Sequence, residues 1–235
     1  MNNTLLVGCS FTDPTWQSAI PWSVQYSSSG PCYISAKAGM GIKGICIEAL
    51  YRLLELPDVK KIIAVLPNLW RMDIEMDTET YLYNAMVDLL KVDNTVWSIR
   101  SPASRKWIIS GGLNYDRKTE QAKIFDLLYK HQGFLVLAKE HFRALQNLID
   151  YCKINKIDLY ISAIQDPMDQ LNNLEYIKSD IKKLLDTVGY NNWFKFDGKF
   201  IDSFLGHRRH PTTEEHKILC EYIIRGINHG NYKTV

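Results

Sequence analysis

The chain has 235 residues, of which 46% are hydrophobic, and a formal net charge of +2. This length and composition suffice for one sizeable core or two small ones. Its 28 Lys and Arg against 26 Asp and Glu argue against a dedicated nucleic-acid binder, because neutralising phosphates requires a concentrated basic surface. We interpret short basic pairs such as Lys60-Lys61 as solvated faces.

The cysteines and the N-terminal sequence indicate in which cellular compartment the protein is expected. Five scattered cysteines without a CxxC pair suggest neither a disulfide framework nor a zinc knuckle, and reduced thiols are the simplest interpretation. The first predicted strand begins at about Thr4, which leaves no room for a signal peptide, and no apolar run approaches the ~20 residues of a membrane span. We expect a cytoplasmic protein; a virus- or phage-encoded protein that reaches its substrate within a particle fits the same observation.

Apolar runs predict five strands in chain order. Thr4 to Val7 ends at a glycine, and the unbroken run from Lys61 to Leu66 is typical of a buried parallel strand. The other predicted strands are Cys32 to Ala36, Ile157 to Ala163 and Trp193 to Phe196. Residues 13–31, rich in Pro, Ser and Trp, predict a loop or a short irregular helix.

Helical periodicity lies between these strands. Apolar residues share one helical face over 45–53 and again over 138–152, and a further helix is predicted over 171–188. The last helix opens at Pro211-Thr212, where Thr212 and Glu215 match a capping box. The alternation of strands and helices predicts an α/β fold with three layers, α/β/α, around a parallel sheet of about five strands.

Residues 75–116 fit this alternation poorly. Leu82, Met86, Leu89 and Leu90 have helical spacing, and residues 96–109 carry two tryptophans that fit a hairpin or a long loop. We interpret 75–116 as an insertion after the third strand of a single domain, 1–235. It would serve as a lid or as a contact surface toward another copy or a particle.

Small polar motifs follow the predicted strands. Gly8-Cys9-Ser10-Phe11-Thr12, Gly39-Met40-Gly41 and Asn68 each come after an apolar strand, and His210-Pro211 follows the last one after a loop. Ligands bind outside the carboxyl ends of parallel strands, so we expect these motifs to share one edge of the sheet. Ser10 would be a nucleophile and His210 its base, while the amides of Ser10 and Gly39 and the side chain of Asn68 would bind an oxyanion.

In these motifs the sequence resembles the SGNH (GDSL-like) hydrolases. Val-Gly-Cys-Ser-Phe-Thr is similar to their first block, Ala38-Gly39-Met40-Gly41 to the glycine block, Asn68 to the asparagine block and His210-Pro211-Thr212 to the last. The resemblance implies a three-layer α/β/α fold, hydrolysis of esters, Ser10 as nucleophile, His210 as base, and Gly39 and Asn68 as oxyanion donors.

The sequence departs from the family pattern at the acid. The triad Asp is expected three residues before the histidine, where this chain has His207. Losing the orienting acid of a serine protease costs about ten-thousandfold in rate. Either another group orients His210, such as Asp202, Asp197 or a backbone carbonyl, or the enzyme is slow, or catalysis has been lost. Cys9 also stands where the family has Asp, and Leu66 where its third block has Gly.

Simpler readings of the same residues remain open. Ser10 could cap a helix, Asn68 could be a turn residue, and His210 could be an ordinary surface residue. Cys9 could replace Ser10 as the nucleophile. Arg71 could bind an anionic substrate group or merely pair with Asp73.

Two ligand-binding alternatives also remain. His207, His210 and His216 could bind a metal, although their spacing matches no zinc signature. Residues 39–44 match GxGxxG between a strand and a helix, with Asp58 some twenty residues on, which is a dinucleotide-binding pattern using Gly39, Gly41 and Gly44.

We therefore expect a serine esterase that needs no cofactor or metal and hydrolyses O-acyl esters, such as acetyl esters, of a carbohydrate or small molecule. No nucleic-acid partner is expected. The alternative hypothesis is a non-catalytic interaction protein on the same fold, with Trp97 to Trp107 as its contact surface.

Overall fold

The computed structural model describes residues 3–14, 19–28, 30–77, 105–109, 127, 130–131, 133–171, 174–196, 201 and 210–228, with backbone only for 74–77 and 105–109. Five parallel strands form the main sheet, in the order β2-β1-β3-β6-β7. They are β1 (Asn3–Gly8), β2 (Cys32–Ala36), β3 (Val59–Leu66), β6 (Asp158–Ala163) and β7 (Phe194–Lys195). The prediction of about five parallel strands is confirmed.

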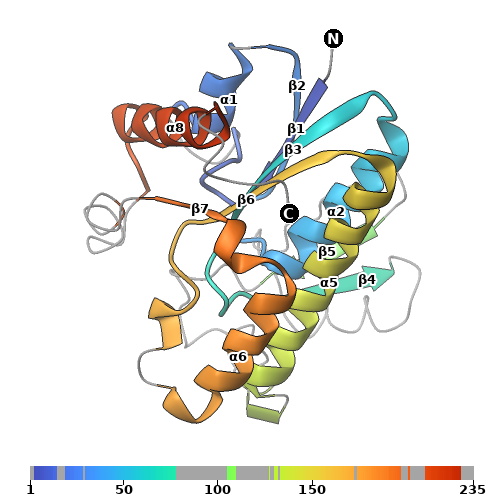
Figure 1. The fold of residues 1–235 in the computed structure, drawn as a ribbon, viewed down its shortest axis with the longest axis vertical. Helices are drawn as coiled ribbons and strands as arrows, with labels where there is room; N and C mark the ends of the chain where they lie inside the picture. The colour runs from blue at the N-terminus through green and yellow to red at the C-terminus, as the bar shows by residue number, and fades with distance from the viewer. Residues whose placement is uncertain are drawn as a thin grey trace, which may run out of the picture.

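Helices cover both faces of this sheet (Figure 1). The helices α2 (Ile42–Glu55), α5 (Phe134–Asn155) and α6 (Glu175–Thr187) lie on one face, and α1 (Trp22–Ser27) and α8 (Thr213–Asn228) lie together on the other. The three-layer α/β/α architecture predicted from the sequence is therefore correct. Within the described residues, no helix is long and apolar enough to cross a membrane.

The central strand β3 explains why the sheet is sandwiched. Its residues Ile62 to Leu66 are all 0% exposed, so both faces of the strand are covered. Fully burying one Leu or Ile side chain contributes about 1.5–3 kcal/mol. An unbroken apolar run is stable only where helices cover both sides, which is what the sequence predicted.

A second, two-stranded sheet follows β3. Its strands β4 (Asp73–Asp77) and β5 (Arg105–Ile109) are antiparallel, with Glu75 opposite Trp107. Residues 105–109 are thus a strand, within the stretch predicted as a hairpin or long loop. The predicted helix through Leu82 to Leu90 and the rest of 78–104 lie outside the described residues, so the role of 75–116 as a lid or contact surface stays a prediction.

Helix boundaries follow local signals in the sequence. At α8, Glu215 Oε2 accepts a bond from Thr212 N (2.7 Å) and Thr212 Oγ1 accepts one from Glu215 N (3.3 Å), which confirms the capping box. The helix predicted over 171–188 begins later, at Glu175. Leu171 instead closes the short 3₁₀ helix η1 (Asp169–Leu171), and its carbonyl accepts the N–H of Leu174 (2.9 Å).

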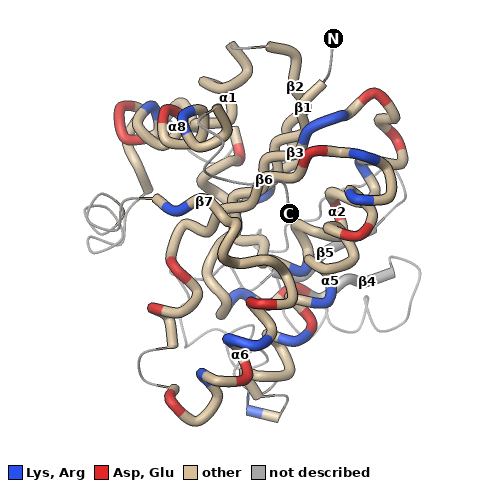
Figure 2. Tube along the Cα trace, in the orientation of Figure 1, with Lys and Arg blue, Asp and Glu red and all other residues tan. Residues whose placement is uncertain are grey.

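Charged residues of both signs are interspersed along the outer helices. Figure 2 shows Lys and Arg alternating with Asp and Glu along α6 and α8. Ion pairs such as Lys178–Glu175 and Arg225–Glu221 join neighbouring turns of these helices. This mixture agrees with the low net charge of the sequence.

Candidate active site at the carboxyl edge of the sheet

The carboxyl ends of the strands lie side by side. Gly8, the last residue of β1, is in register with Ala36 at the end of β2 and with Val65 near the end of β3. Ser10, Gly39 and Asn68 each follow one of these ends within three residues. The topology therefore brings the three predicted motifs to adjacent positions at one edge.

Ser10 lies in a tight turn after β1. The carbonyl of Cys9 accepts bonds from both Thr12 N (2.8 Å) and Asp13 N (3.0 Å). A Cβ at Gly8 would lie 2.1 Å from Thr12 Oγ1, so this turn requires a glycine before Cys9. The turn leaves the Ser10 side chain only 3% exposed.

Two simpler readings of this turn do not agree with the structure. Cys9 is 0% exposed and belongs to the hydrophobic core, which argues against a nucleophilic thiol there. Ser10 caps none of the described helices, because the next one, α1, begins at Trp22 with Pro21 as its N-cap.

The glycine motif forms a second turn against the first. Asp13 Oδ2 accepts the N–H of Ala38 (2.9 Å), so the β1 turn and the β2 turn are joined directly. Gly39 has φ of 83°, in the left-handed region that favours glycine. Within the described part of the chain, no acceptor takes up the backbone N–H of Ser10 or of Gly39.

Asn68 is the second residue of the loop that follows β3. It is half-buried, and the next residue, Leu69, donates its N–H to Gln170 Oε1 (2.7 Å), which fixes the loop. Among the described residues, none donates a hydrogen bond to the buried Oδ1 of Asn68. An asparagine that shapes its own turn would accept a backbone N–H there, so the turn-residue reading finds no support.

His210 lies against the Ser10 turn. Its ring is 5.2 Å from that of Phe11, centroid to centroid, and the two planes are tilted by 38°. Burial, and then the positive charge of Arg71, lower the pKa of His210, so the imidazole is neutral at pH 7. Asp202, His207 and Asp197, considered as groups that orient this ring, lie outside the described residues.

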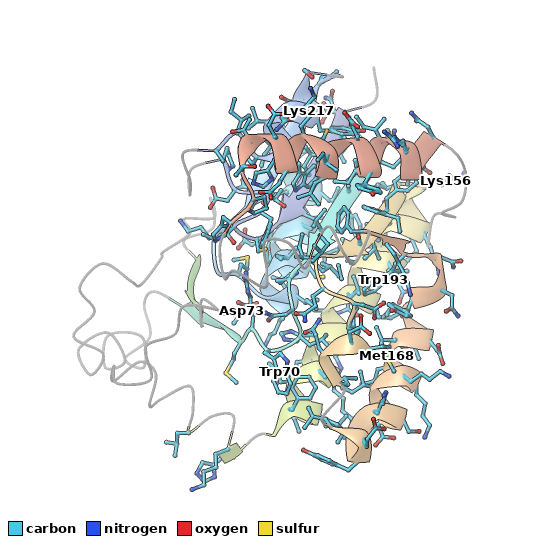
Figure 3. The ribbon with its side chains drawn as sticks, turned by 90° about the vertical axis from the view of Figure 1, so that its left-hand side faces the viewer. Trp70, Asp73, Lys156, Met168, Trp193 and Lys217 are labelled. Carbon is cyan, nitrogen blue, oxygen red and sulfur yellow. The ribbon has the colours of Figure 1, made fainter. Side chains whose placement is uncertain are left out.

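The N-terminus of α2, next to Gly39, is held by a carboxylate that the sequence analysis mentioned only as a partner for Arg71. Asp73 Oδ1 accepts the N–H of Gly41 (2.7 Å) and Asp73 Oδ2 accepts that of Gly44 (2.9 Å). Burial raises the pKa of Asp73 to about 6, although the two amides and the charges of Arg71 and Lys43 oppose this rise. Figure 3 labels Asp73 near the end of α2.

This carboxylate argues against dinucleotide binding at the GxGxxG match. The pattern depends on free amides at the helix N-terminus for a pyrophosphate. Here the amides of Gly41 and Gly44 bind Asp73. A Cβ at Gly41 would lie 2.7 Å from both Arg71 O and Asp73 Oδ2. The missing Cβ atoms of Gly41 and Gly44 therefore make room for the side chain of Asp73.

His141 of α5 is the second group that the sequence analysis missed. It is 0% exposed, and its Nδ1 accepts the N–H of Lys43 (3.2 Å). Burial lowers the pKa of His141 to about 4, so the ring is neutral; because Nδ1 accepts the N–H of Lys43, the ring carries its proton on Nε2. A histidine beside Phe142 on the apolar face of the predicted helix was the available signal.

Arg71 completes this buried cluster. It is 4% exposed and donates from Nη1 to the carbonyl of Met40 (3.3 Å). Its charge opposes the rise in the pKa of Asp73 and lowers the pKa of His210. Both roles considered for Arg71, binding an anionic substrate group or pairing with Asp73, stay predictions.

The residues that could bind a metal give no site in the described part of the chain. No three His, Cys, Asp or Glu side chains gather there in a way that could hold an ion. All five cysteines are described and free, which agrees with the reduced thiols expected from the sequence.

Comparisons with known proteins give a fold but no close relative. No family model and no curated protein matches the chain. Among solved structures, it is similar to the psychrotrophic esterase EstA from Pseudoalteromonas sp., at 9% identity and a TM-score of 0.51 over 97% of this chain and 98% of that one. It is also similar to a catalytic mutant of the acetylxylan esterase Axe2 from Geobacillus stearothermophilus (11% identity, TM-score 0.48, 100% and 96% covered).

Proposed function

We propose that this chain, which has the fold of the SGNH-type esterases, is a serine esterase acting on O-acyl esters, such as acetyl esters, of a carbohydrate or small molecule. The observation that carries the proposal is the contact of His210 with Phe11. It brings a neutral imidazole to the turn that holds Ser10. The likeness to an esterase supports the same reaction class.

In the proposed reaction, Ser10 Oγ attacks the ester carbonyl carbon while His210 accepts the hydroxyl proton. The resulting oxyanion would accept bonds from the N–H groups of Ser10 and Gly39 and from the side-chain amide of Asn68. His210 then returns the proton to the leaving alcohol, which frees an acyl-serine. Water, deprotonated by His210, hydrolyses this intermediate and restores Ser10.

Asp202 and His207 are the groups that we propose to orient His210. A histidine at 207 cannot supply the negative charge of the expected triad acid. Where His207 alone orients the ring, we expect slower turnover than in a serine hydrolase with a complete triad, since losing the acid costs a serine protease about ten-thousandfold. A carboxylate from Asp202 would restore the charge.

The direct test is hydrolysis of p-nitrophenyl acetate by the wild type and by two variants. Ser10→Ala removes the nucleophile and His210→Ala removes the base. Each should lower kcat by about a thousandfold or to background. Cys32→Ser is a matched control, because this half-buried thiol lies on the edge strand β2, and it should leave kcat within twofold.

The result distinguishes the two hypotheses. Turnover that survives in both Ser10→Ala and His210→Ala would show that the site assignment is wrong. A folded wild type that neither hydrolyses esters nor reacts at Ser10 would instead favour a non-catalytic interaction protein on this fold.

A further inference from the structure

We propose that Asp73, Arg71 and His141 are positioning residues of the oxyanion hole, which clamp the N-terminus of α2 to the loop after β3. The inference rests on the proposed esterase function and deepens it. It assigns a role to three buried polar side chains that the reaction itself does not use.

The clamp holds four of the five backbone positions from Met40 to Gly44. Asp73 accepts the amides of Gly41 and Gly44, His141 accepts that of Lys43, and Arg71 donates to the carbonyl of Met40. Arg71 lies in the loop after β3, Asp73 is the first residue of β4 and His141 belongs to α5, so residues 40–44 are fixed from three separate segments. A helix N-terminus normally exposes these amides to solvent.

The clamp lies between the two proposed oxyanion donors. Gly39 directly precedes the clamped segment, and Asn68 lies in the same loop as Arg71, which leads into β4 at Asp73. Fixing one end of this loop to α2 therefore fixes the distance between the Gly39 amide and the Asn68 side chain. An error of about 1 Å in such a geometry can cost a hundredfold in rate.

The glycines of the motif allow the close approach that the clamp needs. A Cβ at Gly44 would lie 2.9 Å from Asp73 Oδ2, which is closer than real Cβ atoms ordinarily come to another atom. Without a Cβ, the Gly44 amide can donate to the same oxygen at 2.9 Å. Arg71, Lys43 and the thiol of Cys46 are the other charged or titratable groups that act on Asp73. The amides of Gly41 and Gly44, and then the charges of Arg71 and Lys43, oppose the rise in the pKa of Asp73 that burial causes.

Asp73→Asn tests the clamp. An amide can accept one of the two backbone N–H groups but presents an NH₂ to the other. We expect kcat for p-nitrophenyl acetate to fall by about ten- to a hundredfold with KM within twofold, because the substrate-binding surface is unchanged. The matched control is Asp150→Asn on the exposed face of α5, where the carboxylate accepts a bond from Gln146 of the same helix, and it should leave both constants within twofold.

Hydrogen exchange provides a readout besides activity. The amides of residues 41–44 should exchange at least tenfold faster in Asp73→Asn than in the wild type, while those of β3 should not change. If Asp73→Asn does not fold, the same two measurements are made on His141→Leu, which removes the ring nitrogen that accepts the N–H of Lys43.

The outcomes separate this inference from the proposed function. A folded Asp73→Asn with wild-type kcat and wild-type exchange would overturn the clamp, even if Ser10→Ala is inactive. A wild type without esterase activity would overturn the proposed function alone, and the exchange measurement would still test the clamp.

Discussion

Two influences act on His210 in the same direction. Burial removes solvent from the ring and Arg71 adds a nearby positive charge, so both disfavour the protonated imidazole. A general base must be neutral to accept a proton, and this environment keeps it so at neutral pH. The residue therefore has the surroundings of a base, rather than those of an exposed histidine before a helix.

The pH dependence of kcat/KM tests this environment. The rate should rise with pH as His210 loses its proton, and the midpoint should lie below the unperturbed value of about 6.5. Arg71→Met removes the positive charge and should move the midpoint upward, whereas Arg71→Lys retains the charge and should move it less. A wild-type midpoint above 6.5, or one that is the same in all three proteins, would contradict this account.

Replacing Gly39 with alanine tests whether the turn after β2 requires a glycine. At φ of 83°, a residue with a Cβ costs about 1–2 kcal/mol, so Gly39→Ala should lower the free energy of unfolding by that amount. It should also lower kcat, because relaxing the turn moves the amide. Chemical denaturation measures the first effect. Gly30→Ala is the control, since a Cβ there meets nothing within 4 Å, and an equal loss in both variants would refute the argument.

At the scale of elements, α8 begins at Thr213, three residues after His210, and fixes the end of that segment. Thr212 and Glu215 cap it, and Thr213 Oγ1 accepts the N–H of Ile20 (3.1 Å) from the segment before α1. The position of the base thus depends on the first turn of α8.

Removing the cap should destabilise the protein measurably. Thr212→Ala should lower the free energy of unfolding by about 1 kcal/mol, as typical for an N-cap. Thr187→Ala at the end of α6 is the matched control, because its hydroxyl binds only the carbonyl of Leu184, and its effect should stay within about 0.5 kcal/mol. Equal effects of the two substitutions in urea denaturation would show that the capping box contributes nothing specific.

Elements with a continuous signal could be predicted from the sequence. β3 has an unbroken apolar run, and α2 and α5 have regular apolar spacing, so burial and periodicity predicted all three. The pairing of β4 with β5 could not be predicted, because it joins residues some thirty apart across a stretch with no clear pattern.

The same contrast holds within the site. Ser10, Gly39 and Asn68 could be placed because each follows a predictable strand. The clamp by Asp73 and His141 could not, since a helix N-terminus in the sequence does not tell which distant side chain will bind it.

At the scale of the whole molecule, buried histidines make stability depend on pH. His141 and His216 both have a pKa lowered by burial to about 4, against 6.5 when unfolded. Between these values the unfolded chain binds more protons, so the free energy of unfolding falls as the pH is lowered from 6.5 to 4. Asp73, whose pKa is raised to about 6, acts in the opposite sense over part of this range.

His141→Asn isolates one of these contributions. Asn keeps an acceptor near the Nδ1 position and does not titrate, so the variant should lose about 3 kcal/mol of the pH dependence between pH 6.5 and 4. Urea denaturation at several pH values measures it. An unchanged pH dependence would show that His141 is not buried in its neutral form.

The most direct test of the proposed esterase is covalent labelling of Ser10 by a fluorophosphonate, followed by mass spectrometry of the digested protein. We expect one adduct, on Ser10, that is absent in Ser10→Ala and forms at least a hundredfold more slowly in His210→Ala, because the base activates the hydroxyl. A folded wild type that acquires no adduct, or acquires it on another residue, would contradict the account.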